Sequence, residues 1–141
     1  MLEVVRSFEP DLVVLLGWMH LLADAFVESF PETLNLHPAF LPLEPEHDRV
    51  VMPDGLGIPA FRGARAVRDA LAAGSPWVGA TLHRVTAHTD RGPVMTRKPL
   101  RIAAGEDETR LMEPVHEVER VVVKEGLTRW LYEAANAGGD S

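Results

Sequence analysis

Apolar and polar positions follow two different periods along the chain. A continuous apolar run at residues 11–17 (DLVVLLG), flanked by Pro10, predicts a strand covered on both faces. Apolar residues at helical spacing instead mark residues 21–30 (LLADAFVESF), which Pro31 ends. By the same criteria we predict helices at 2–8, 21–30, 63–73 and most of 107–135, and strands at 11–17, 33–37, 78–85 and 93–102.

Strands and helices alternate in this order, which predicts an α/β fold. Such an order is typical of a mostly parallel sheet with helices on both faces. The length of 141 residues fits one domain, which we expect to cover residues 1–137, with 138–141 as a flexible tail. Pro114 interrupts the last helical region, and we expect it in the first turn of a helix that starts at Met112 or Glu113.

Composition and charge narrow the functional classes. The formal net charge of −7, without a basic stripe, argues against nucleic acid or an anionic membrane as a partner. The absence of cysteine excludes disulfides and thiolate chemistry. No apolar run reaches the roughly 20 residues of a membrane span, and the N-terminus lacks the features of a signal peptide. These features predict a cytoplasmic protein.

Two polar side chains end the short strand at 33–37. Asn35 and His37 are two residues apart on a strand, so they face the same side, while Leu36 faces the other. Ligands of α/β sheets bind at the carboxyl ends of strands. A helix cap and a hydrogen-bonded core histidine are the ordinary structural roles of such residues, but Pro38 keeps the chain extended and disfavours a cap.

A second candidate, Asp90, lies in the turn TAHTDRGP between the last two predicted strands. Alone it fits a turn aspartate that bonds its own backbone. Metal and nucleophile sites have no support, because the six histidines include no H-E-x-x-H pattern and none of the four serines lies in a G-x-S-x-G elbow.

Four segments in order resemble the folate-dependent formyltransferases. They are PDLVVLLGWMHLL, FPETLNLHPAFLP, FRGARAVRDALAAG and GATLHRVTAHTDRGPV, and within the family they are most similar to the branch that formylates glycinamide ribonucleotide in purine biosynthesis. The resemblance implies a Rossmann-like formyltransferase fold. It also implies transfer of a formyl group from 10-formyltetrahydrofolate, as cosubstrate, to a small amine, without a metal.

The resemblance also implies roles for individual residues. The catalytic residues would be Asn35, His37 and Asp90. The folate would contact Met19, His20, Leu21, Leu22, Asn35, Val85, Thr86 and His88, with His83 near the same pocket. The family often has arginine in place of His20. These residue types suit formyl transfer, because an amide and an imidazolium can donate to a tetrahedral oxyanion, and a carboxylate favours the imidazolium.

The sequence departs from the family at residues 43–61, which are longer than the family's connection. The Asp54-Gly55 pair predicts an inserted loop or hairpin, which would act as a lid or change the choice of acceptor.

A second departure is that Met1 falls inside what resembles the helix before the family's fourth strand. The N-terminal half, with the loop that holds the acceptor's phosphate, is therefore expected to be missing. The strand at 11–17 would then have an open edge, to be covered by an N-terminal-half partner chain, by a second copy, or, if the sequence is truncated, by residues that precede Met1. Two other functions stay open: a formyltetrahydrofolate hydrolase, and a non-catalytic folate-binding or interaction module.

Overall fold

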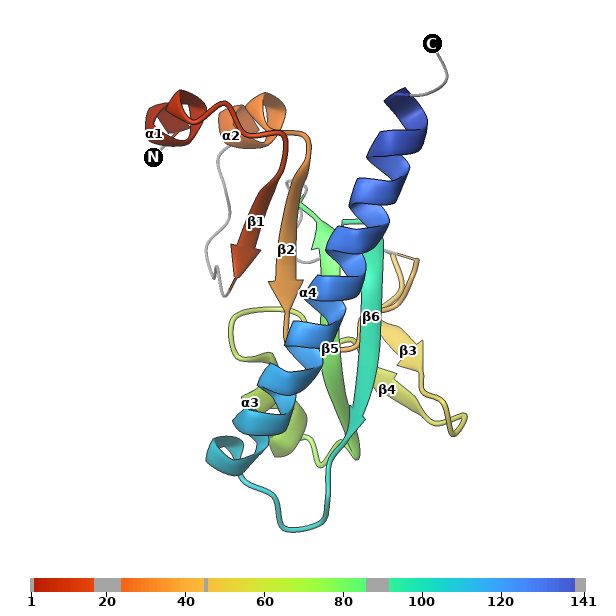
Figure 1. Cartoon of the computed structure of the whole chain (residues 1–141). Helices are drawn as coiled ribbons and strands as arrows, with labels where there is room; N and C mark the ends of the chain where they lie inside the picture. Colours follow the sequence, from red (N-terminus) through yellow and green to blue (C-terminus); the bar gives the residue numbers. More distant parts are fainter. Residues whose placement is uncertain (1, 17–23, 45, 86–91, 139–141) are drawn as a thin grey trace.

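A computed structural model describes residues 2–16, 24–44, 46–85 and 92–138 and is drawn in Figure 1. Its elements are α1 (Leu2–Ser7), β1 (Val13–Leu16), α2 (Asp24–Ser29), β2 (Thr33–His37), β3 (Arg49–Val51), β4 (Gly57–Pro59), α3 (Ala66–Ala72), β5 (Trp77–Arg84), β6 (Val94–Arg101) and α4 (Glu108–Gly138). The predicted strand at 33–37 is confirmed to the residue, and α3 ends near the predicted stop, where Gly74 has φ +68°. None of the helices in these ranges has the length and apolar character needed to cross a membrane.

Four strands form one sheet in the order β1-β2-β5-β6. β1 and β2 are parallel, whereas β2–β5 and β5–β6 are antiparallel. The predicted α/β fold is confirmed, and within the described residues the parallel pairing is confined to β1 and β2. The connection from Arg84 to Val94 is too short for the crossover of a dozen or more residues that parallel pairing of β5 and β6 would need.

α4 crosses one face of this sheet (Figure 1) and buries the main apolar cluster against it. That cluster comprises Leu34, Leu36, Ala80, Leu82, Met95, Val118 and Val122. The helix lies so close to the strands at Gly126 that a Cβ atom there would lie 2.4 Å from Leu82 Cδ2. The hydroxyl of Thr96 on β6 also donates to the Val122 carbonyl at 2.8 Å.

α4 begins earlier than expected. The predicted start at Met112 or Glu113 is wrong, because Asp107 caps the helix five residues upstream: its carboxylate accepts from the Arg110 N–H at 2.8 Å. Pro114 therefore lies inside the helix rather than in its first turn.

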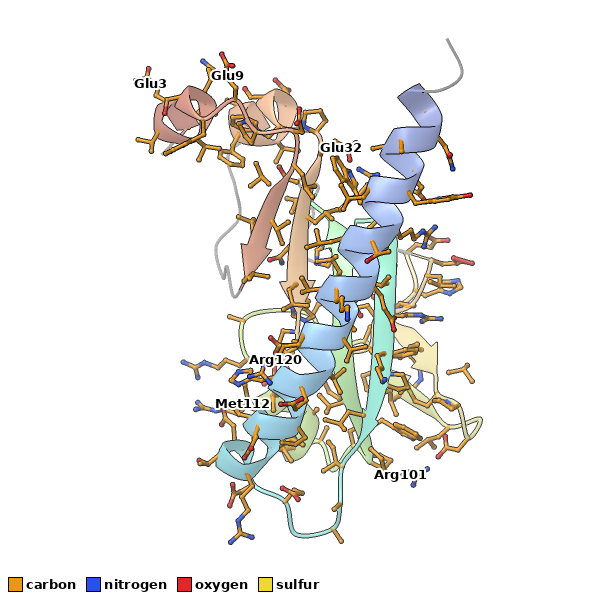
Figure 2. The ribbon with its side chains drawn as sticks, in the orientation of Figure 1. Glu3, Glu9, Glu32, Arg101, Met112 and Arg120 are labelled. Atoms are coloured by element: carbon orange, nitrogen blue, oxygen red, sulfur yellow. The ribbon has the colours of Figure 1, made fainter. Side chains whose placement is uncertain are left out.

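A polar contact also ties α4 to the start of β2, near the labelled Glu32 in Figure 2. Glu32 Oε2 accepts from Trp130 Nε1 and from Arg84 Nη1, both at 2.7 Å. The hydrogen bond from Trp130, followed by that from Arg84, lowers the pKa of Glu32 below its usual value of 4.5. Nearer the start of α4, burial raises the pKa of Glu119.

The predicted hairpin between residues 43 and 61 is present in the structure. β3 and β4 pair antiparallel, with Val50 opposite Ile58, and the Met52 N–H donates to the Leu56 carbonyl at 2.8 Å. Gly55 has φ +89°, a conformation that side chains disfavour, which explains the glycine in the turn.

β1 is the edge strand of the described sheet. The expectation of burial on both faces is wrong: Val13, Val14 and Leu15 are half-buried, and Leu16 is 64% exposed. α1 next to it has no buried residue, and Val4 and Phe8 are also exposed. Within the described ranges β1 pairs with β2 alone, so this side of the sheet is an apolar edge.

Candidate functional site

Four polar side chains share the sheet face opposite α4. Asn35 and His37 alternate with Leu34 and Leu36 on β2, so they face away from the apolar cluster. In the antiparallel register His83 of β5 lies opposite Asn35, and Thr81 lies opposite His37. All four are buried, with exposed fractions of 8% for Asn35, 4% for His37, 3% for His83 and 0% for Thr81. We call these four residues the polar quartet.

Thr81 holds the chain segment that leaves β2. Its hydroxyl donates to the Ala39 carbonyl at 2.6 Å and accepts from the Leu41 N–H at 3.0 Å. Directly before it, the Ala39 N–H donates to the His37 carbonyl at 2.9 Å. The buried hydroxyl group of Thr81 therefore bonds the backbone of residues 37–41 at two points.

Arg97 of β6, which lies opposite Thr81 in the pairing register, supports the same segment. Its Nη1 donates to the Leu41 carbonyl at 2.8 Å, and its guanidinium lies 4.2 Å from the centre of the Phe40 ring. Burial lowers the pKa of Arg97 from its ordinary value.

The imidazole of His37 is oriented by a backbone carbonyl. His37 Nε2 lies 2.7 Å from the Phe61 carbonyl oxygen. Because a carbonyl can only accept, Nε2 carries the proton in this hydrogen bond. The same reasoning places the proton of His83 on Nδ1, which lies 3.0 Å from the Arg84 carbonyl. The two rings thus have opposite tautomers when neutral.

Several predicted site residues lie outside the described residues: Met19, His20, Leu21, Leu22, Thr86, His88 and Asp90. Val85 is described; it follows β5, is half-buried, and donates from its N–H to the Thr33 carbonyl at 2.9 Å. The structure therefore brings together Asn35 and His37 with His83. It also adds two groups that the sequence analysis missed, the Thr81 hydroxyl and the Phe61 carbonyl.

A separate groove of about 660 Å³ lies along α4. It is lined by Val121, Lys124, Glu125, Thr128, Arg129 and Tyr132 and includes no member of the polar quartet. We therefore centre the candidate site on the quartet. In the described ranges no three His, Asp or Glu side chains gather as a metal site would require.

An α/β sheet with polar side chains at the carboxyl end of a strand is typical of Rossmann-like proteins that bind a small ligand at that end. A family model described as "Formyl transferase" matches residues 1–45 and 57–127. The match covers most of the chain, and the chain belongs to this family. The first strand and turn of the β3–β4 hairpin fall between the two matched segments.

Individual relatives agree with the family. The phosphoribosylglycinamide formyltransferase of Mycobacterium tuberculosis (strain H37Rv) is 41% identical over 115 residues, which are 81% of this chain and 46% of that protein. The formyltetrahydrofolate deformylase of Escherichia coli (strain K12) is 32% identical over 133 residues, which are 94% of this chain and 40% of that protein. This chain thus spans less than half the length of these two relatives.

A solved structure supports the fold directly. The crystal structure of phosphoribosylglycinamide formyltransferase from Bacillus halodurans superimposes with a TM-score of 0.75 at 26% identity, over 94% of this chain and 61% of that one.

Proposed function

We propose that this chain is the catalytic and folate-binding part of a cytoplasmic formyltransferase that transfers the formyl group of 10-formyltetrahydrofolate to glycinamide ribonucleotide. The observation that carries the proposal is the pairing of Asn35 and His37 on one buried sheet face, opposite His83, in a chain of this family. The 41% identity to a phosphoribosylglycinamide formyltransferase favours this acceptor.

The reaction needs hydrogen-bond donors near the formyl oxygen. The amine nitrogen attacks the formyl carbon, and the oxygen becomes an oxyanion, to which the Asn35 amide donates. Because Nε2–H of His37 is directed at the Phe61 carbonyl, a protonated His37 donates through Nδ1. When the bond to the folate nitrogen breaks, His37 gives that nitrogen a proton, and the amine's surplus proton restores His37. In this proposal the Asp90 carboxylate favours the imidazolium.

The folate is bound, in this proposal, by residues around the quartet. Met19, His20, Leu21 and Leu22 follow β1, and Val85, Thr86 and His88 follow β5 in the sequence. β1 and β5 are the two strands that flank β2, so both segments follow strands next to Asn35 and His37, which supports a shared pocket.

The acceptor is held, we propose, by additional polypeptide that pairs with the edge of β1. The exposed Leu16 on β1 supports this idea, because an apolar strand edge is completed by another strand in a stable sheet. The proposed occupant is the N-terminal half of a formyltransferase. A second copy of this chain is the alternative, and size-exclusion chromatography with light scattering separates the two.

A second function has specific support. The E. coli deformylase matches 94% of this chain, and in a formyltetrahydrofolate hydrolase water would take the place of the amine. A non-catalytic folate-binding or interaction module is a third alternative. Release of formate without an acceptor identifies the hydrolase, and folate binding without either reaction identifies the module.

Substitution of the two donors tests the proposed mechanism. In the active assembly, His37→Ala and Asn35→Ala should each lower turnover by about 100- to 1000-fold, because both act on charge that develops in the transition state. The affinity for reduced folate, measured by calorimetry, should change much less. His116→Ala, on the exposed surface of α4, is the matched control. Equal losses of turnover and folate affinity would mean that the pair is structural.

A further inference from the structure

The tip of the β3–β4 hairpin is fastened to the main sheet by one carboxylate. Asp54 Oδ2 accepts from Trp77 Nε1 at 3.1 Å and from Arg101 Nη2 at 3.2 Å, while Oδ1 accepts from the Leu56 N–H at 3.0 Å. The Arg101 guanidinium also lies 4.5 Å from the centre of the Trp77 ring. Arg101 is labelled at the end of β6 in Figure 2.

The body of the hairpin is packed against the sheet as well. Val50, Met52 and Ile58 are buried and form one apolar cluster with Phe40 and Trp77. A lid would have to break these contacts and the Asp54 bonds each time it opened. The hairpin is therefore better suited to hold a fixed position than to open and close over a site.

The base of the hairpin leads directly to the residue that orients His37. The Ala60 N–H donates to the Asp48 carbonyl at 2.8 Å, and the Arg62 N–H donates to the Ala60 carbonyl at 2.9 Å. The Arg62 side chain, only 11% exposed, donates from Nη2 to the His47 carbonyl at 2.9 Å. Phe61 lies between these bonded residues, and its carbonyl accepts from His37 Nε2.

We propose that the β3–β4 hairpin is a positioning element for His37, with Asp54 as the positioning residue that fixes it to the sheet through Trp77 and Arg101. The hairpin holds the Phe61 carbonyl against the imidazole and thereby sets the tautomer and orientation of the ring. Much of the hairpin, residues 46–56, lies between the two segments that match the family, whereas β4 and Phe61 lie inside the second segment. The consequence of this positioning for catalysis rests on the proposed function, but the positioning itself does not.

Nitrogen-15 NMR of the full chain, labelled in histidine, tests the proposal without folate or acceptor. At about pH 8, above the ordinary histidine pKa of about 6.5, wild-type His37 should show a protonated Nε2 and an unprotonated Nδ1. Asp54→Asn keeps the Oδ1 acceptor for Leu56 but sets an amide NH₂ opposite the two donors of Trp77 and Arg101. We expect roughly tenfold faster amide exchange at Met52 and Ala60 and a shift of His37 toward a mixture of tautomers.

Two further variants make the test decisive. Trp77→Phe keeps an aromatic ring, although a smaller one, and removes one donor to Asp54, so it should move His37 in the same direction and by a smaller amount. Asp69→Asn makes the same chemical change on the exposed surface of α3 and should leave His37 unchanged. If Asp54→Asn does not fold, Trp77→Phe decides. A His37 ring that keeps its Nε2–H tautomer in the folded variants would overturn the proposal, whether or not the hairpin amides exchange faster.

Because this readout is independent of substrates, the two hypotheses can fail separately. If the chain gives the expected NMR response but its mixture with the N-terminal half of a formyltransferase stays inactive, only the proposed function is contradicted.

Discussion

We predict that the hydroxyl of Thr81 contributes strongly to the free energy of unfolding. Thr81→Val keeps the shape of the side chain but removes the group that donates to the Ala39 carbonyl and accepts from the Leu41 N–H. Ala39 and Leu41 are buried, with exposed fractions of 2% and 1%, so water cannot easily replace the lost partner. The perturbation is therefore two unsatisfied backbone groups at the segment that follows His37.

The expected magnitude follows from these two groups. Each buried group left without its hydrogen bond costs about 1–3 kcal/mol, and the new buried methyl group returns about 0.8 kcal/mol. The net loss should be about 1–5 kcal/mol, a large part of the roughly 5–15 kcal/mol that stabilises a domain. Thr81→Ser is the matched control, since it keeps the hydroxyl and loses one methyl group, at a cost of about 1 kcal/mol.

Urea unfolding followed by tryptophan fluorescence measures both variants. The valine variant should lower the midpoint with an unchanged slope, which shows that stability rather than compactness has changed. A valine variant as stable as the wild type, or a serine variant destabilised as much as the valine variant, would refute the role of the hydroxyl.

Three further predictions concern packing and pH. Gly79→Ala should cost about 3 kcal/mol or more, because its Cβ would lie 2.4 Å from the Lys98 carbonyl oxygen. At Gly57 an added Cβ would meet only the Arg49 side chain, at 3.7 Å, which is an ordinary contact, so Gly57→Ala should stay within about 0.5 kcal/mol; denaturant titration compares the two variants. Because the pKa of Glu32 is lowered in the folded state, the ionised carboxylate stabilises the fold above pH 4.5, and this stabilisation is lost as the pH falls through the folded-state pKa. Glu32→Gln should therefore lower the free energy of unfolding at neutral pH by about 1 kcal/mol after screening. The variant should also lose less stability than the wild type when the pH is lowered. The pKa of Glu119 is raised, so its ionised form is unfavourable in the folded state. Glu119→Gln should therefore raise the melting temperature at neutral pH and leave it unchanged below pH 4.5. A lower melting temperature of this variant at neutral pH would contradict the argument.

The sequence predicts some parts of this molecule better than others for physical reasons. β2 was predicted to the residue because Pro31 and Pro38 bracket a short run whose alternation is clear. The start of α4 was not, because Asp107 caps the helix ahead of the proline that drew attention. The pairing directions in the sheet depend on crossover lengths that element order alone does not set.

The candidate site was predictable to a similar degree. Asn35 and His37 share a face by strand geometry, and the structure adds His83 opposite Asn35 through the pairing register. Thr81 lies two residues before His83 on the same strand, so the same alternation could have found it. The Phe61 carbonyl could not have been found, because it is a backbone atom 24 residues from His37 and no residue type encodes it.

The edge of β1 bears on activity through the position of the acceptor. When the amine is held next to the formyl carbon, positioning alone can lower the activation barrier of the transfer by up to about 7–11 kcal/mol. If the acceptor is held by polypeptide that pairs with β1, the present chain should bind reduced folate weakly and transfer formyl groups poorly by itself.

The most direct test is an assay of formyl transfer from 10-formyltetrahydrofolate to glycinamide ribonucleotide, before and after adding the N-terminal half of a phosphoribosylglycinamide formyltransferase. The account predicts no transfer by this chain alone, transfer after the addition, and its loss in the same mixture with His37→Ala. Robust transfer by the monomeric chain alone would contradict the proposal that additional polypeptide holds the acceptor. A stable complex with the added half that binds folate but transfers nothing to the amine would contradict formyl transfer to glycinamide ribonucleotide.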